Sequence, residues 1–142
     1  MFSTIVVGAD DSPTAAEAVQ KAIALVKLTA GQLHIVTAYK PQRFSSSDAG
    51  VDEYLKSLGS DALAQSLLEE LTATARTAGI RAEAHALTRA PADAICEVAA
   101  QVGADLIVVG NKGMQGMRRA LGSVPNSVAH QAPCDVLIAF TT

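Results

Sequence analysis

Two short stretches of the chain share one apolar pattern, and together they constrain the fold more than any other feature. The sequence "TIVVG" occupies residues 4–8 and "LIVVG" occupies residues 106–110. Both runs are continuous, rich in β-branched side chains and closed by glycine, as expected of central parallel strands that are covered on both faces. The pattern therefore predicts two neighbouring strands in the middle of a parallel sheet.

Three further segments are predicted strands, and helical patterns separate all five. Residues 32–39 and 134–140 are largely apolar, whereas residues 80–87 alternate between apolar and polar side chains. Such alternation predicts an edge strand with one face towards solvent. An alternating arrangement of strands and helices is typical of the α/β class.

The helices are expected at residues 12–31, 60–78, 91–102 and 123–131. Ser12 is the predicted N-cap of the first helix, with Pro13 in its first turn and Gly31 at its end. The second helix is expected to bury Leu63, Leu67, Leu71 and Ala75. Residues 40–57, between the second strand and this helix, form a polar connection that is longer than usual. They are interpreted as either a surface loop or a lid over a neighbouring site.

Right-handed crossovers predict an open five-stranded parallel sheet of order 3-2-1-4-5, with helices on both faces, in a single domain over residues 1–142. In such a sheet the winding reverses between the first and fourth strands. Ligands bind outside the carboxyl ends of the strands at this reversal. The sequence places "GADDS" after the first strand and "GNKG" after the fourth.

Composition narrows the class of partner. The chain has 142 residues, 49% hydrophobic and 18% charged, with a net charge of −3, so no general attraction to nucleic acid or to an anionic membrane is expected. No apolar run approaches the length of a membrane span, and the N-terminal residues do not have the pattern of a signal peptide. A cytoplasmic protein is expected.

The metal-ligating residue types do not form a motif. Cys96 and Cys134 show no metal-ligand spacing and are expected to be ordinary reduced residues. His34, His85 and His130 lie on separate elements, and the pair of His130 with Cys134 lacks further ligands. No metal site is therefore predicted among these residues.

A glycine-rich segment after the fourth strand predicts a phosphate site. Glycines at 110, 113 and 122 permit positive φ angles and close approach of backbone N–H groups to an oxyanion, and Ser123 opens a helix. Pro125 removes one donor from that helix, so the cradle depends on Gly122, Ser123 and Val124 as well as the glycine turn. The basic side chains nearby either contact phosphate or are simply solvated; they are Lys112, Arg118 and Arg119.

With these motifs the chain resembles the universal stress protein family of adenine-nucleotide-binding α/β domains. Its nucleotide-binding members carry Gly-x2-Gly-x9-Gly-Ser/Thr, matched here by Gly110, Gly113, Gly122 and Ser123, and both ends of the chain, "VVGADDS" and "HQAPCDVLIAF", are similar. One departure is that eight residues, not nine, separate Gly113 from Gly122. The resemblance implies ATP as ligand, with or without Mg²⁺, and AMP or cyclic AMP as the close alternatives.

The resemblance also implies roles for residues outside the glycine segment. Asp10 matches the aspartate near the ribose and phosphates, or an associated metal, and Ala38 matches the position whose backbone reads adenine. Family members commonly form homodimers through the last strand. The residues expected to bind the nucleotide are Ala9, Asp10, Ala38, Val109, Gly110, Gly113, Gly122, Ser123 and Val124.

No catalytic constellation accompanies this expected site. The sequence lacks a Walker loop and the "SGGxDS" and "HIGH" motifs of related folds, and no nucleophile with a paired base is evident. A non-catalytic, regulatory nucleotide-binding stress protein is therefore expected, with slow ATP hydrolysis left open. The alternative is a nucleotide-free interaction module that acts as a dimer.

Overall fold

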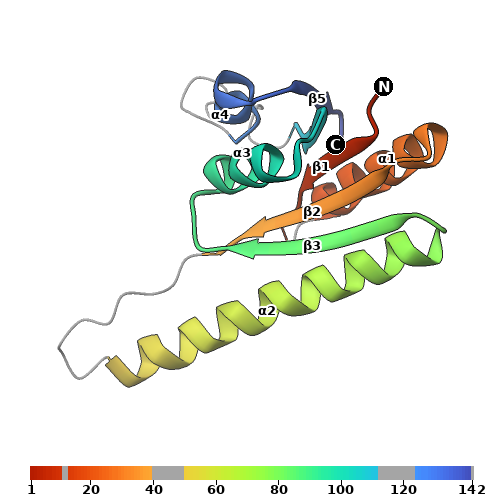
Figure 1. Ribbon diagram of the computed structural model, residues 1–142. Coiled ribbons are helices and arrows are strands. Elements are labelled where there is room, and N and C mark those ends of the chain that lie inside the picture. Colours follow the sequence, from red (N-terminus) through yellow and green to blue (C-terminus); the bar gives the residue numbers. More distant parts are fainter. Residues whose placement is uncertain (11–12, 40–49, 112–123, 142) are drawn as a thin grey trace.

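The computed structural model describes residues 1–10, 13–39, 50–111 and 124–141. Strands and helices alternate along the chain (Figure 1). Their bounds are β1 Thr4–Gly8, α1 Pro13–Thr29, β2 Gln32–Ala38, α2 Gly50–Thr77, β3 Arg81–Leu87, α3 Pro91–Val102, β4 Leu106–Gly110, α4 Val124–Gln131 and β5 Asp135–Ala139. None of the described helices combines the length and apolar character that a membrane span requires.

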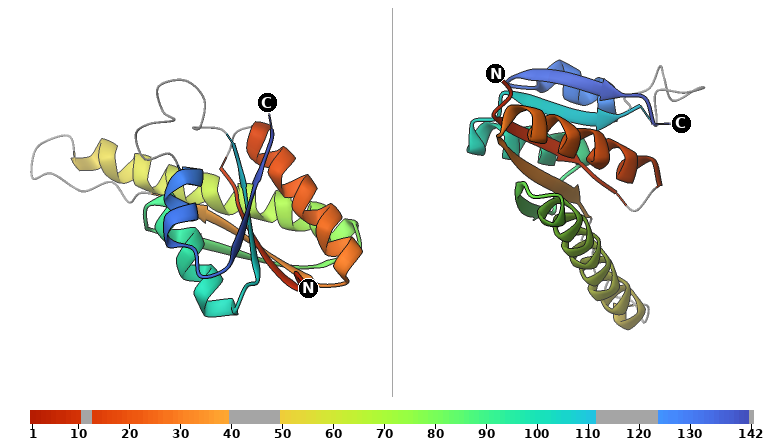
Figure 2. Two further views of the ribbon diagram at one scale, coloured as in Figure 1. Left: turned by 90° about the horizontal axis from the view of Figure 1, so that it is seen from above. Right: turned by 90° about the vertical axis from the view of Figure 1, so that its right-hand side faces the viewer.

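The five strands form one parallel sheet in the order β3-β2-β1-β4-β5, which confirms the predicted topology. The helices lie on both faces: α1 and α2 cover one, and α3 and α4 cover the other (Figures 1 and 2). The two repeated apolar runs are β1 and β4, which pair directly in the centre.

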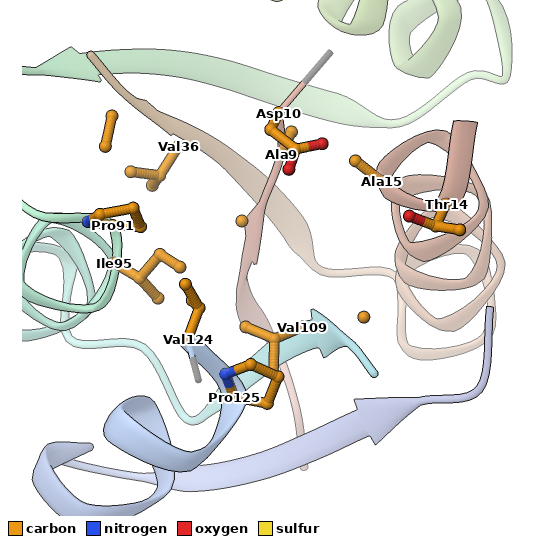
Figure 3. Close-up of a pocket in the computed structure, with 13 residues that line it drawn as sticks. Ala9, Asp10, Thr14, Ala15, Val36, Pro91, Ile95, Val109, Val124 and Pro125 are labelled. Atoms are coloured by element: carbon orange, nitrogen blue, oxygen red, sulfur yellow. The ribbon is translucent and has the colours of Figure 1, made fainter. Parts of the chain in front are cut away.

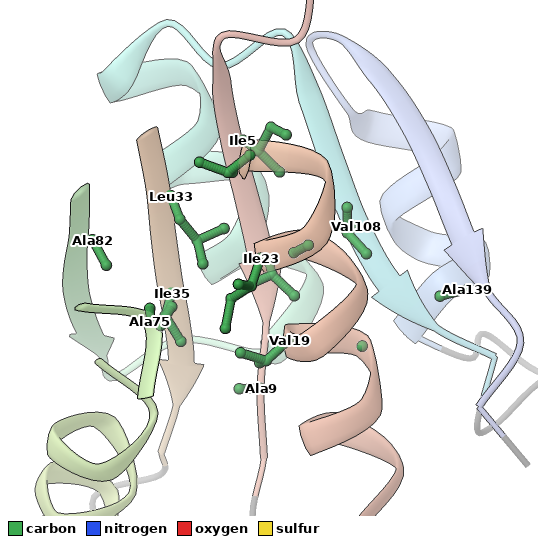
Figure 4. Close-up of a cluster of buried hydrophobic side chains, with 14 of the residues drawn as sticks. Ile5, Ala9, Val19, Ile23, Leu33, Ile35, Ala75, Ala82, Val108 and Ala139 are labelled. Atoms are coloured by element: carbon green, nitrogen blue, oxygen red, sulfur yellow. The ribbon is translucent and has the colours of Figure 1, made fainter. Parts of the chain in front are cut away.

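Alternate side chains of the central strands enter two separate cores. Ile5 and Val7 of β1 point into the core beneath α1 and α2 (Figure 4 labels Ile5), whereas Val6 joins the core beneath α3 and α4. All three side chains are fully buried. Burial on both faces explains why these strands are apolar throughout instead of alternating.

The second helix is longer than predicted. It begins at Gly50, not near residue 60, so residues 50–57 belong to α2 and not to the expected loop. Val51, Leu55 and Leu58 are spaced as on one face of a helix, but Gly50, Gly59 and the serine-rich residues 45–47 favour a loop, which is why a loop is predicted there. The lid interpretation now concerns residues 40–49, which lie outside the described residues.

The predicted buried face of α2 is confirmed at Ala75, and Leu71 packs partly buried against the same core, but the prediction is wrong nearer the start of the helix. Leu63 was expected in the core but is 73% exposed, whereas Ala64 and Leu68 are buried. Two apolar stripes run side by side on this helix, one residue apart. Packing against β2 and β3 selects the stripe that contains Ala64, Leu68 and Ala75.

The end of α1 differs by one residue from the expected cap. Ala30, with φ of 56°, adopts the left-handed conformation, and the Gly31 N–H donates to the Val26 carbonyl at 3.3 Å. Gly31 has a different role, because a Cβ there would lie 2.3 Å from the Ser3 carbonyl oxygen. The glycine thus allows the start of β2 to approach the chain before β1.

Candidate functional site

A pocket lies at the carboxyl ends of the central strands, where the winding of the sheet reverses (Figure 3). It is lined by six of the residues expected to bind a nucleotide, namely Ala9, Asp10, Ala38, Val109, Gly110 and Val124. The other three, Gly113, Gly122 and Ser123, lie outside the described residues. The predicted reversal point and the observed pocket therefore coincide.

Seven further lining residues were not singled out as binding residues by the sequence analysis: Gly8, Thr14, Ala15, Val36, Pro91, Ile95 and Pro125. Gly8 could have been found, because it closes the first predicted strand. Pro91 and Ile95 carry no such signal, because only the packing of α3 across the sheet brings its first turns to this edge.

The pocket has an apolar side and a polar side. Val36, Pro91, Ile95 and Val124 gather on one side, between β2, α3 and α4, while Asp10 and Thr14 lie on the other, by the first turn of α1 (Figure 3). An apolar slot beside a few polar groups is typical of small-molecule sites. The arrangement suits a ligand with one flat apolar part and one polar part.

Two hydrogen bonds hold the chain after β1 against β2. The Ala9 N–H donates to the Val36 carbonyl at 2.9 Å, and the buried Thr37 hydroxyl donates to the Ala9 carbonyl at 2.8 Å. Pairing of β1 with β2 ends at Gly8 and Val36, so Ala38 extends two residues further. Since backbone groups alternate along a strand, Ala38 presents its N–H and C=O to the same side as Val36, towards the pocket.

The glycine that ends β1 allows α3 to lie close to the sheet. A Cβ at Gly8 would lie 2.5 Å from Cδ1 of Ile95, which lines the apolar side of the pocket. The shape of this side therefore depends on the absence of a side chain at position 8.

The glycine that ends β4 lies close to Thr141. Gly110 does not use the positive φ angle that a glycine permits. A Cβ there would lie 3.3 Å from the Thr141 hydroxyl oxygen. The next residue is held firmly, because the Asn111 side-chain oxygen accepts from the Thr141 N–H at 2.9 Å and from its hydroxyl at 3.0 Å.

The electrostatics of the pocket come from one carboxylate and two helix ends. Asp10 is the only ionisable side chain among the described lining residues. The first turns of α1 and α4 both border the pocket, and the N-terminus of a helix favours negative charge. The described part of the site can thus accept an anion of low charge.

The cysteines behave as expected, and two of the histidines lie close together. Cys96 and Cys134 are free thiols. Burial raises the pKa of both, and a nearby carboxylate raises it further, that of Asp93 for Cys96 and that of Asp135 for Cys134. His34 and His85 lie on separate strands, as predicted, but the pairing of β2 with β3 brings their ring nitrogens to 2.9 Å, which was not predicted. Neither histidine lines the pocket.

Comparison with known proteins agrees with the fold. The model of the universal stress protein family matches residues 1–139. A universal stress protein of Mycobacterium tuberculosis is 37% identical over 99% of this chain and 98% of its own length. Universal stress protein YxiE of Bacillus subtilis is 30% identical over 97% of this chain and 99% of its own length.

Solved structures give the same family and include nucleotide complexes. A crystal structure of a universal stress protein in complex with cAMP is 39% identical, with a TM-score of 0.80 and coverage of 99% of this chain and 98% of the other. The universal stress protein of Archaeoglobus fulgidus in complex with dAMP is 25% identical, with a TM-score of 0.64 and coverage of 97% and 98%. Fold, sequence motifs and relatives agree, and this chain therefore belongs to the universal stress protein family.

Proposed function

We propose that this protein binds an adenine nucleotide in the pocket between β1, β2 and β4 and acts as a regulatory, non-catalytic stress protein. The observation that carries the proposal is the convergence of six predicted binding residues on one pocket at the reversal point of the sheet. The apolar side suits the adenine ring, whose edge would contact the backbone of Ala38, a lining residue. The sugar and phosphate would then lie towards Asp10 and the glycine segment.

Among adenine nucleotides, a monophosphate with few charges has the strongest support, and cyclic AMP is the first choice. Asp10 is the only described ionisable group at the pocket, and a carboxylate repels a triphosphate unless a cation such as Mg²⁺ lies between them. The glycine segment is one residue shorter than the family pattern for ATP. In addition, the relative of 39% identity was crystallised with cAMP. ATP with Mg²⁺ remains the alternative that the sequence motif favours.

The same lining supports a role without catalysis. A hydrolase requires a nucleophile with a base, or a metal with a base, and the described lining offers one carboxylate and one hydroxyl, from Asp10 and Thr14. We therefore expect binding without turnover. If ATP were hydrolysed slowly, phosphate release would be measurable and would disappear in Asp10→Ala.

Isothermal titration with cyclic AMP, AMP, ADP and ATP, the last with and without Mg²⁺, tests the proposal. We expect cyclic AMP or AMP to bind more tightly than ATP. Gly122→Val should abolish binding, because the motif requires close approach of backbone N–H groups at this position. Gly116→Val is the matched control: it adds the same side chain to the same segment at a glycine outside the motif, and it should retain binding.

Two results would refute this proposal. The first is the absence of heat change with every nucleotide at millimolar concentration. The second is equal loss of binding in both glycine variants, since the effect would then not depend on the motif. Circular dichroism of each variant verifies that the domain remains folded.

A second candidate function is interaction through a dimer, supported by the open edge of the sheet. β5 is an edge strand that carries Leu137 and Ile138, which are 41% and 37% exposed, and Phe140 follows at 68%. An apolar edge strand readily pairs with another strand. We propose that two copies associate through this edge.

Light scattering after size exclusion measures the association. Ile138→Asp places a charge on the β5 edge and should convert a dimer into a monomer. Leu63→Asp, on the exposed side of α2, is the control and should leave the dimer intact. A wild-type chain that is monomeric at all concentrations would exclude this mode of action.

A further inference from the structure

A cluster of three metal-ligating side chains lies outside the nucleotide pocket, on the neighbouring strands β2 and β3. It consists of His34, Glu83 and His85, and one ligand atom from each lies within 4.8 Å of the other two. It is the one such group in the described part of the chain. None of the three residues lines the pocket described above.

The register of the sheet creates this cluster. β2 and β3 pair in parallel, with His34 opposite Glu83 and Val36 opposite His85 (Figure 1 shows the two strands side by side). Residues two apart on a strand share a face, so Glu83 and His85 project from β3 to the same side as His34 from β2. Three potential ligands are thus presented by rigid, hydrogen-bonded backbone.

The distances fit a small divalent cation. Nδ1 of His34 lies 2.9 Å from Nε2 of His85 and 3.7 Å from a carboxylate oxygen of Glu83. Ligand atoms about 2.0–2.1 Å from a tetrahedral zinc ion are separated by about 3.3–3.4 Å. The two observed distances bracket this value, and the third separation, between His85 and Glu83, is within 4.8 Å.

Burial directs the ligand atoms towards one point. The His34 side chain is 5% exposed, and its Nε2 has no hydrogen-bond partner among the described residues. Its Nδ1 faces His85 and Glu83, at 2.9 and 3.7 Å. The Glu83 side chain is 69% exposed, so an ion could enter from solvent and retain water in a fourth position.

We propose that His34, Glu83 and His85 form a binding site for a Zn²⁺ ion, with one position left to solvent. Two imidazole nitrogens and a carboxylate oxygen are ligands that zinc accepts, and three protein ligands with one open position are a common zinc arrangement. The competing interpretation of the short distance is a hydrogen bond in which the two rings share one proton. The two interpretations differ in the response to added metal.

The test uses the full chain after treatment with EDTA. Titration with ZnSO₄ should show one ion bound per chain, and the melting temperature should rise with zinc concentration. Glu83→Gln changes an exposed side chain of nearly equal size and should weaken binding about 10-fold or more. His85→Ala removes a direct ligand and should weaken zinc binding on the order of 100-fold. This loss is at or above the largest one caused by changing a residue that only holds a ligand in place.

Matched controls distinguish zinc binding at this cluster from nonspecific zinc binding elsewhere on the protein. His130→Ala removes an exposed histidine outside the cluster, and Cys134→Ser removes a thiol; neither should change the affinity. Substitution by Co²⁺ should give visible bands of a four-coordinate ion without a thiolate charge-transfer band. Gly122→Val should bind zinc normally, because the nucleotide site is separate.

The proposal is overturned if zinc produces neither a binding heat nor a rise in melting temperature. It is equally overturned if Glu83→Gln and His85→Ala bind zinc as the wild type does, or if the control variants lose binding. In each case the shared-proton interpretation would account for the distance between His34 and His85.

Discussion

Asp105 shows how one side chain can link the two central strands at their amino ends. Its two carboxylate oxygens accept from the Ser3 N–H at 3.0 Å and the Thr4 N–H at 3.1 Å, and its own N–H donates to the Thr4 carbonyl at 3.0 Å. Burial acts to raise the pKa of this carboxyl, but the hydrogen bonds from Thr4 and Ser3 outweigh it and lower the pKa below 3.8. The folded state therefore favours the ionised form.

This shift predicts a pH-dependent contribution to stability. Because the folded pKa lies below the unfolded one, the contribution is fully present above the unfolded pKa and is lost as pH falls through the folded pKa. Asp105→Asn should lower the free energy of unfolding by about 1–2 kcal/mol at neutral pH, allowing for solvent exposure. Urea unfolding followed by circular dichroism should show the difference from wild type shrinking below pH of about 4. A difference that is constant with pH would contradict this role.

At the scale of elements, three helices end with the same reversal of the chain but with different residues at the left-handed position. α2 and α3 have Gly79 and Gly103 there, with φ of 87° and 65°, whereas α1 has Ala30. The following N–H donates to a carbonyl five residues earlier in each case. Only α1 adopts this turn without glycine.

The end of α1 therefore predicts opposite effects for two neighbouring substitutions. Ala30→Gly relieves the left-handed strain and should raise the free energy of unfolding by about 0.5–1 kcal/mol. Gly31→Ala forces a Cβ against the Ser3 backbone and should lower it by about 1–3 kcal/mol or more. Thermal unfolding of the two variants tests this. If Gly31 were the left-handed cap, Ala30→Gly would destabilise the helix instead.

At the scale of the whole molecule, the strand order was predictable because it follows from few constraints. Continuous apolar runs identified β1 and β4 as central strands, alternation identified β3 as an edge, and right-handed crossovers left one order. This order also located the pocket. The start of α2 was not predicted because Gly50, Gly59 and the serine-rich residues 45–47 favour a loop. The burial of Ala64 and Leu68 was missed because apolar residues also lie on the neighbouring face of the helix.

The sequence by itself determined the class of fold, the topology and the residues at the strand ends, because periodicity and chain handedness are local or nearly local properties. Only the tertiary structure decided which side chains meet across elements. The apolar wall from Ile95 depends on how α3 crosses the sheet, and the cluster of His34, Glu83 and His85 depends on the register of β2 with β3. A shift of one residue in that register would turn Glu83 and His85 away from His34.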